Sequence, residues 1–255
     1  MEVHHHPHAG HKKFKEYFLE FLMIFLAVTM GFFAESLREH ITENKKEKEY
    51  IEGIISDIKK DTATLSYVLK YYDRIIPRMD SGRKYFYKLQ HPGALKTIMG
   101  IQFSLAGYED FIYTDATLQQ VKSSGGMLLI KNKAAVDSVL RYDSKVKTAL
   151  INEKVLGDLM IGMQRNMAGL FNLQPILETV GRSISPVEQK QLVDSLNKFM
   201  PDFLLTHDPP TLGQFYNDYT YYQNIATLVK LQMTDLKKTA THTIQFLQKS
   251  YQLSD

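Results

Sequence analysis

The chain has 255 residues, of which 44% are hydrophobic and 23% are charged, a composition that excludes a polytopic membrane protein, a collagen-like chain and an intrinsically disordered one. Cysteine is absent, which excludes disulfide bonds, a thiolate zinc site and a cysteine nucleophile. The formal net charge of +3, from 31 Lys and Arg against 28 Asp and Glu, is too small to indicate nucleic acid binding by itself.

The first thirteen residues are rich in histidine, and we expect residues 1–13 to form a flexible cytoplasmic tail. Neutral imidazoles bind zinc, nickel and copper, so the tract is a candidate metal site. The alternative is a disordered tail that binds metal only incidentally. The candidate ligands are His4, His5, His6, His8 and His11.

Residues 14–34 are predicted to form a transmembrane helix. No charged residue occurs from Phe21 to Ala34, and extension back to Phe14 gives a helix of about 31 Å, enough to cross a bilayer. Aromatic residues flank the apolar run on both sides, as they do at membrane interfaces. The alternative is an amphipathic helix that lies on a membrane surface or is buried in the protein. The flanking aromatic residues are Phe14, Tyr17, Phe18, Phe32 and Phe33.

Lysines near the span favour a cytoplasmic N-terminus. Lys12, Lys13 and Lys15 precede the span closely, whereas only Arg38 follows it within the nearest turns. We therefore expect residues 35–255 to lie outside the cytoplasm.

Three residues of the span are candidate functional positions. Glu20 is a candidate for a proton or ion path, because a carboxylate inside a membrane is costly. The alternative is a carboxylate near the interface that reaches a neighbour such as Tyr17. Ala27 and Gly31 are four residues apart and would let a second helix approach closely.

A long stalk helix is predicted to follow the span. Residues 35–76 contain no proline, and apolar residues recur at intervals of three and four from Ile51 onwards. Pro77 is expected to kink or end this helix, with a shorter one at residues 80–90. Residues 94–113 are interpreted as a broken helix or loop.

Clear start and stop signals follow. Thr114 or Asp115 is expected to cap a short helix that the Ser123–Gly126 segment ends, and Asn132 to cap a long one with a buried face from Val139 to Met167. A helix is predicted from Ser185 to Met200. Residues 207–210 are interpreted as a turn before a last helix of about 35–40 residues, over 212–247. The predicted fold is therefore all-α: an N-terminal transmembrane helix, a stalk, and an antiparallel bundle of long helices over residues 35–255.

Several segments of the chain are distinctive: EYFLEF (16–21), GFFAE (31–35), KEYI (48–51), DIKKDT (57–62), DATL (115–118), KSSGG (122–126) and IKNK (130–133). Through these segments the chain resembles an uncharacterised family of bacterial single-pass membrane proteins. The resemblance implies an N-terminal membrane anchor and a helical body, and it supplies no catalytic residue and no substrate. We therefore expect the chain to lie in the bacterial inner (cytoplasmic) membrane.

The motifs of familiar enzymes are missing. The sequence contains no HExxH, phosphate loop or dinucleotide fingerprint, and His207 beside Asp208 is a weak acid–base pair that fits a turn better. We therefore predict a non-enzymatic protein with no cofactor, no nucleic acid and no small-molecule substrate. Its expected role is a structural or interaction module that forms homo-oligomers or binds a protein partner. The alternatives are an extracytoplasmic sensor that binds a small ligand, and an ion- or proton-coupled subunit that uses Glu20.

Overall fold

A computed structural model describes residues 14–90, 95–105, 107, 109–172 and 203–253, together with positions 174, 188, 191, 194 and 195. Within these residues all regular secondary structure is helical, apart from one isolated antiparallel bridge between Phe171 and Leu204. The all-α prediction is confirmed. The elements are α1 (Phe14–Lys84), η1 (Phe86–Gln90), α2 (Leu95–Ser104), α3 (Ala116–Ser123), η2 (Gly126–Leu128), α4 (Lys133–Leu170) and α7 (Pro209–Tyr251).

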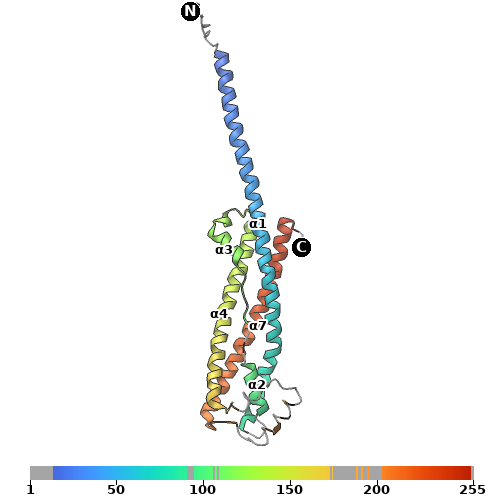
Figure 1. The fold of residues 1–255 in the computed structure, drawn as a ribbon, viewed down its shortest axis with the longest axis vertical. Helices are drawn as coiled ribbons and strands as arrows, with labels where there is room; N and C mark the ends of the chain where they lie inside the picture. Colours follow the sequence, from blue (N-terminus) through green and yellow to red (C-terminus); the bar gives the residue numbers. More distant parts are fainter. Residues whose placement is uncertain are drawn as a thin grey trace, which may run out of the picture.

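Three long helices form the bundle (Figure 1). Helix α7 runs antiparallel to both α1 and α4 and packs against each of them. Helices α1 and α4 run in the same direction, so the chain must return along the whole bundle between them. This return includes the segment between α2 and α3, whose described residues are not helical. The first part of α1 projects beyond the bundle (Figure 1).

Helix α1 is continuous through Pro77, so of the two outcomes predicted there, a kink or an end, the end is wrong. The separate helix predicted at residues 80–90 is instead the last part of α1 followed by η1. Pro77 lies on the exposed face, where the backbone carbonyl that loses its hydrogen bond can meet water. The buried stripe continues past it through Met79 and Gly82. Tertiary packing on both sides of the proline therefore outweighs its local effect.

The local end signals behave largely as predicted. The Asn132 side chain accepts a hydrogen bond from the Ala135 N–H at 3.2 Å, and Gly125, with φ of 71°, takes the left-handed conformation after α3. The interpretation of residues 207–210 as a turn is corrected in part. Asp208 caps α7 by accepting from the Thr211 N–H at 3.0 Å, and the two prolines form the first turn of the helix. The helix predicted from Ser185 to Met200 lies outside the described residues, apart from isolated positions.

Aromatic rings join the ends of the three long helices at the end of the bundle far from the projecting part of α1. Phe215 of α7 is the centre of this cluster, with ring centroids 5.9 Å from Phe86, 5.6 Å from Phe171 and 6.4 Å from Tyr219. Such pairs add about 0.5–1.5 kcal/mol each beyond the burial of their area.

Gly53 lets α3 approach α1 closely. A Cβ atom at this position would lie 2.7 Å from Thr117 Cγ2 and 3.2 Å from Thr117 Oγ1, so the threonine or the helix that carries it would have to shift. Glycine is therefore needed here for packing, although it lowers the intrinsic stability of a helix.

We expect Gly53→Ala to lower the free energy of unfolding by about 1–2 kcal/mol, because overpacking outweighs the gain in helix propensity. Gly162→Ala in α4 is the matched control, since nothing lies within 4 Å of a Cβ there, and it should raise stability. Urea denaturation of the full chain, followed by circular dichroism, measures both. Stabilisation by both substitutions would contradict the close approach at Gly53.

Candidate functional site

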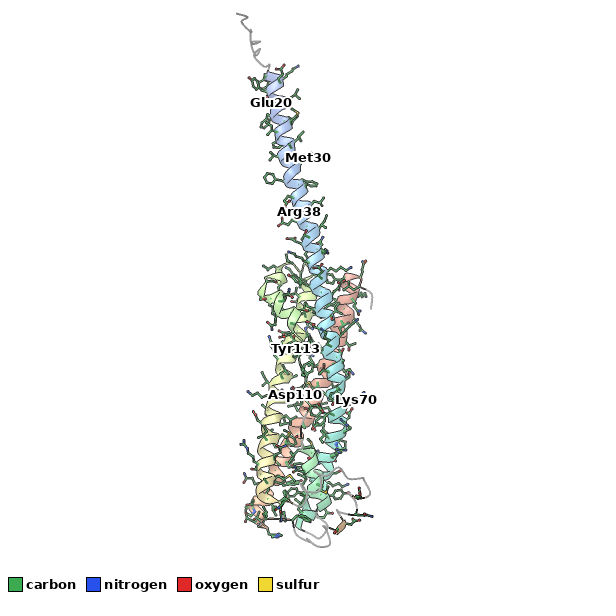
Figure 2. All side chains as sticks on the ribbon, viewed as in Figure 1. Glu20, Met30, Arg38, Lys70, Asp110 and Tyr113 are labelled. Atoms are coloured by element: carbon green, nitrogen blue, oxygen red, sulfur yellow. The ribbon has the colours of Figure 1, made fainter. Side chains whose placement is uncertain are left out.

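The outer half of α1, defined here as residues 14–46, is exposed at nearly every position, and its residues 21–34 carry no charge. Its best 18-residue window has a mean hydropathy of 2.0, and no residue of that window is buried, so the helix is long and apolar enough to cross a membrane. Figure 2 shows Glu20, Met30 and Arg38 on a single helix with no described element alongside. Large apolar side chains such as Phe25, Val28 and Met30 are about half exposed or more.

Of the predicted site residues, the structure describes the three in the apolar helix but not the five N-terminal histidines. Glu20, Ala27 and Gly31 all lie on the exposed outer half, and nothing lies within 4 Å of a Cβ built on Gly31. The five histidines of residues 4–11 lie outside the described residues. Among the described residues, no group of three His, Asp or Glu is arranged to hold a metal ion.

A second feature, which the sequence reasoning missed, is a set of five buried carboxylates inside the bundle. All five hold one stretch of chain, the return segment, defined here as residues 109–131. Backbone N–H groups donate to four of them at 2.8–2.9 Å, and a tyrosine hydroxyl donates to the fifth at 2.9 Å. The pairs are Lys131 N with Glu47, Thr117 N with Asp57, Thr114 N with Asp61, Phe111 N with Glu153, and Tyr113 Oη with Asp143.

These contacts give hydrogen-bond acceptors to backbone N–H groups of the return segment that have none within the segment itself. A buried backbone N–H without a partner costs about 1–3 kcal/mol, and an extended segment has no helical carbonyl to bond. The carboxylates of α1 and α4 therefore replace the acceptors of a missing neighbouring strand or helix. Figure 2 shows Asp110 and Tyr113 of this segment beside the long helices.

Asp57 also corrects the predicted cap of α3. The Asp115 side chain makes no capping hydrogen bond, although Asp115 holds the N-cap position. Asp57 of α1 accepts from the N–H of Thr117, in the first turn of α3, at 2.9 Å. The cap therefore comes from a residue 60 positions away in the sequence, which also explains why α3 packs tightly on α1.

Two of the carboxylates are held in the ionised form. Burial acts to raise the pKa of Asp57, but hydrogen bonds from Thr117 and Lys60 hold that pKa below its ordinary value. Burial likewise opposes ionisation of Asp143, and hydrogen bonds from Lys122 and Lys147, at 2.8 and 2.9 Å, lower its pKa.

The other two shifted carboxylates lie deeper and lack a cationic partner. Burial raises the pKa of Asp61, and the hydrogen bonds from Tyr142 and Thr114 offset this only in part. Burial raises the pKa of Glu153 to about 7, with a further contribution from Asp110, against the single bond from Phe111. Glu153 therefore titrates near neutral pH.

One sequence signal would have found three of these five residues. Asp61 falls on the predicted apolar stripe of α1, and Asp143 and Glu153 fall at buried positions within the apolar stripe of α4. An acidic residue on a core-facing stripe has to find a buried donor, since an unpaired buried charge is very costly. The identity of that donor is not local information.

An open groove of about 710 Å³ lies between α1 and the end of α7. Lysines line it, and Ile55 and Leu253 contribute apolar surface. Lys48 and Lys59 are eleven residues apart on one helix, hence about 17 Å along its axis, so they do not converge on one small anion.

No family model, curated protein or solved structure matches the chain.

We expect Asp61→Ala to lower the free energy of unfolding by about 3–5 kcal/mol, because it leaves the buried Tyr142 hydroxyl and the half-buried Thr114 N–H without an acceptor. Asp73→Ala is the control on the same helix. Its side chain is 61% exposed and pairs with Lys230, a contact worth about 1 kcal/mol or less. Urea denaturation of both variants provides the comparison, and equal losses would contradict the role given to Asp61.

We expect the melting temperature to fall as the pH rises from 5.5 to 8.5. The pKa of Glu153 is raised in the folded chain, so its contribution to stability is complete below its ordinary pKa and lost as the pH rises through about 7. Asp57 and Asp143 have lowered pKa values and stay ionised over this range.

Glu153→Gln keeps an acceptor for Phe111 and removes the titration, so at pH 8.5 it should raise the melting temperature by on the order of 5 °C and have little effect at pH 5.5. Exposed Glu52→Gln is the control and should leave the pH profile unchanged. An unchanged profile in Glu153→Gln would assign the pH dependence to another group.

Proposed function

We propose that the chain is a non-enzymatic, single-pass membrane protein whose helical body acts as a structural or protein-interaction module. Residues 14–34 form the anchor, the N-terminus is cytoplasmic, and the bundle lies outside the cytoplasm of a bacterial inner membrane. One observation carries this proposal. Residues 14–34 of α1 expose an apolar surface long enough to span a bilayer, and no described part of the chain packs against them.

Such a surface is unfavourable in water. Each large apolar side chain that remains exposed forgoes about 1.5–3 kcal/mol of burial, and a contiguous patch of this size marks a membrane or protein contact. The helix also satisfies its internal polar group, since the Thr29 hydroxyl donates to the Phe25 carbonyl at 2.7 Å. The first charges after the apolar run, Glu35 and Arg38, pair with each other at 2.5 Å, consistent with an exit into water.

The polar groups of the bundle support an interaction role over catalysis. The buried carboxylates are not available as catalytic groups in a cleft, because their oxygens accept hydrogen bonds from the return segment. The lysines of the open groove do not converge on one point. A rigid helical body on a stalk is a form that presents surfaces to other proteins.

The test uses the full chain with alkaline phosphatase fused after Asp255, an enzyme that is active only outside the cytoplasm. We expect the fusion to be active and to resist carbonate extraction from membranes. Leu26→Arg should abolish both properties, because arginine at the centre of a spanning helix costs about 2.5–3.5 kcal/mol. Leu128→Arg is the control, since Leu128 is 90% exposed but lies on the bundle.

Extraction of the unsubstituted chain by carbonate would overturn the anchor. An inactive fusion that stays in the membrane would support the proposed anchor but contradict the proposed orientation.

A further inference from the structure

The part of the predicted stalk helix that projects from the bundle, residues 35–46 and called the stalk from here on, contains a short apolar stripe with no partner in the described chain. Its only apolar side chains are Leu37 and Ile41, which are 53% and 61% exposed. They are four residues apart, so they lie one above the other on the same face of α1. Charged residues occupy most of the remaining surface of the stalk. An exposed leucine and isoleucine adjacent on one face form a contact surface for another helix.

The stripe belongs to a longer register. Spacings of three and four residues extend it from Leu37 back through Ala34, Met30 and Ala27 to Met23, all of them exposed. In the other direction the same register reaches Asn44 and Lys48, which are polar. The Asn44 side chain accepts a hydrogen bond from Lys131 at 2.7 Å, so the apolar register ends where α1 enters the bundle.

A register of alternating three- and four-residue steps is the pattern of two helices that wrap around each other. We propose that a second copy of this chain covers the stripe, so that two α1 helices pair in parallel from Met23 to Ile41. The parallel orientation rests on the proposed function, because two copies anchored in one membrane enter it in the same direction. The pairing gives the interaction module a defined partner.

Charge and side-chain size favour a second copy. The stalk carries three acidic and three basic residues, so two identical stalks have no net charge to repel each other. Glu35 and Arg38 pair within one helix, as do Lys45 and Glu49, which leaves the stripe between them apolar. Ala27 and Ala34 are small, which permits close approach within lipid. Gly31 borders this face.

The test uses cysteine cross-linking of the full chain in native membranes. The protein has no cysteine, so each disulfide reports only the introduced residue. Leu37→Cys and Ile41→Cys place the thiol on the stripe, whereas Glu39→Cys and Thr42→Cys place it on the far side of the same helix turns. After mild oxidation we expect disulfide-linked dimers to form several-fold faster at 37 and 41 than at 39 and 42.

A second pair of variants checks the chemistry of the contact. In the Ile41→Cys chain, Leu37→Glu should suppress cross-linking, because it sets two like charges against each other across the stripe. Glu39→Gln in the same chain should leave cross-linking unchanged.

Equal cross-linking at all four positions would indicate random collision and overturn the proposal. No dimer at any position, with the protein in the membrane fraction, would overturn the pairing and leave the anchor intact. Loss of the protein from the membrane fraction would instead count against the proposed function.

Discussion

Hydrogen bonds from backbone N–H groups to buried carboxylates are the interaction on which the rest of this structure depends. Because α1 and α4 run in the same direction, the chain has to return along the bundle before α4 begins. Outside α3 and η2 the return segment is non-helical, and none of the described residues forms a strand beside it. Acidic residues on the two flanking helices supply the acceptors that a sheet or helix would provide. The position of α3 and the start of α4 both follow from where these bonds place the chain.

The carboxylates also fix the register of the return segment. Glu47, Asp57 and Asp61 lie at different heights on α1, and each accepts from a different residue of the segment. A shift of the segment by one residue would break all of these bonds together and leave charges buried without donors. The way in which the charge of a carboxylate is balanced differs between the shallower and the deeper positions. Asp143 is balanced by lysines, whereas Glu153 has no cation and a pKa raised to about 7.

The sequence predicted what local patterns determine. The apolar stripes of α4 and α7, the cap at Asn132 and the glycine stop at Gly125 each depend on residues within a few positions of one another. Pro77 misled because its local effect is outweighed by packing on both sides of it. The buried carboxylates were missed because their donors lie far away in the sequence: 60 residues separate Asp57 from Thr117, and 84 separate Glu47 from Lys131. The long apolar helix over residues 14–34 was predicted from composition, since apolarity and length are local properties.

The continuity of α1 has a mechanical consequence. One unbroken helix of 71 residues, about 105 Å long, runs from the apolar outer half to the far end of the bundle. If its outer half spans a bilayer, the orientation of the bundle is fixed to that of the span, because α1 has no break between them. A helix tilt of about 20° from the membrane normal, a common value for such spans, would displace the far end sideways by roughly a third of the length of the helix. The position of the aromatic cluster at that end would therefore change widely with the tilt of the span. The tilt of a few turns of helix inside the membrane determines which neighbouring proteins the bundle can contact.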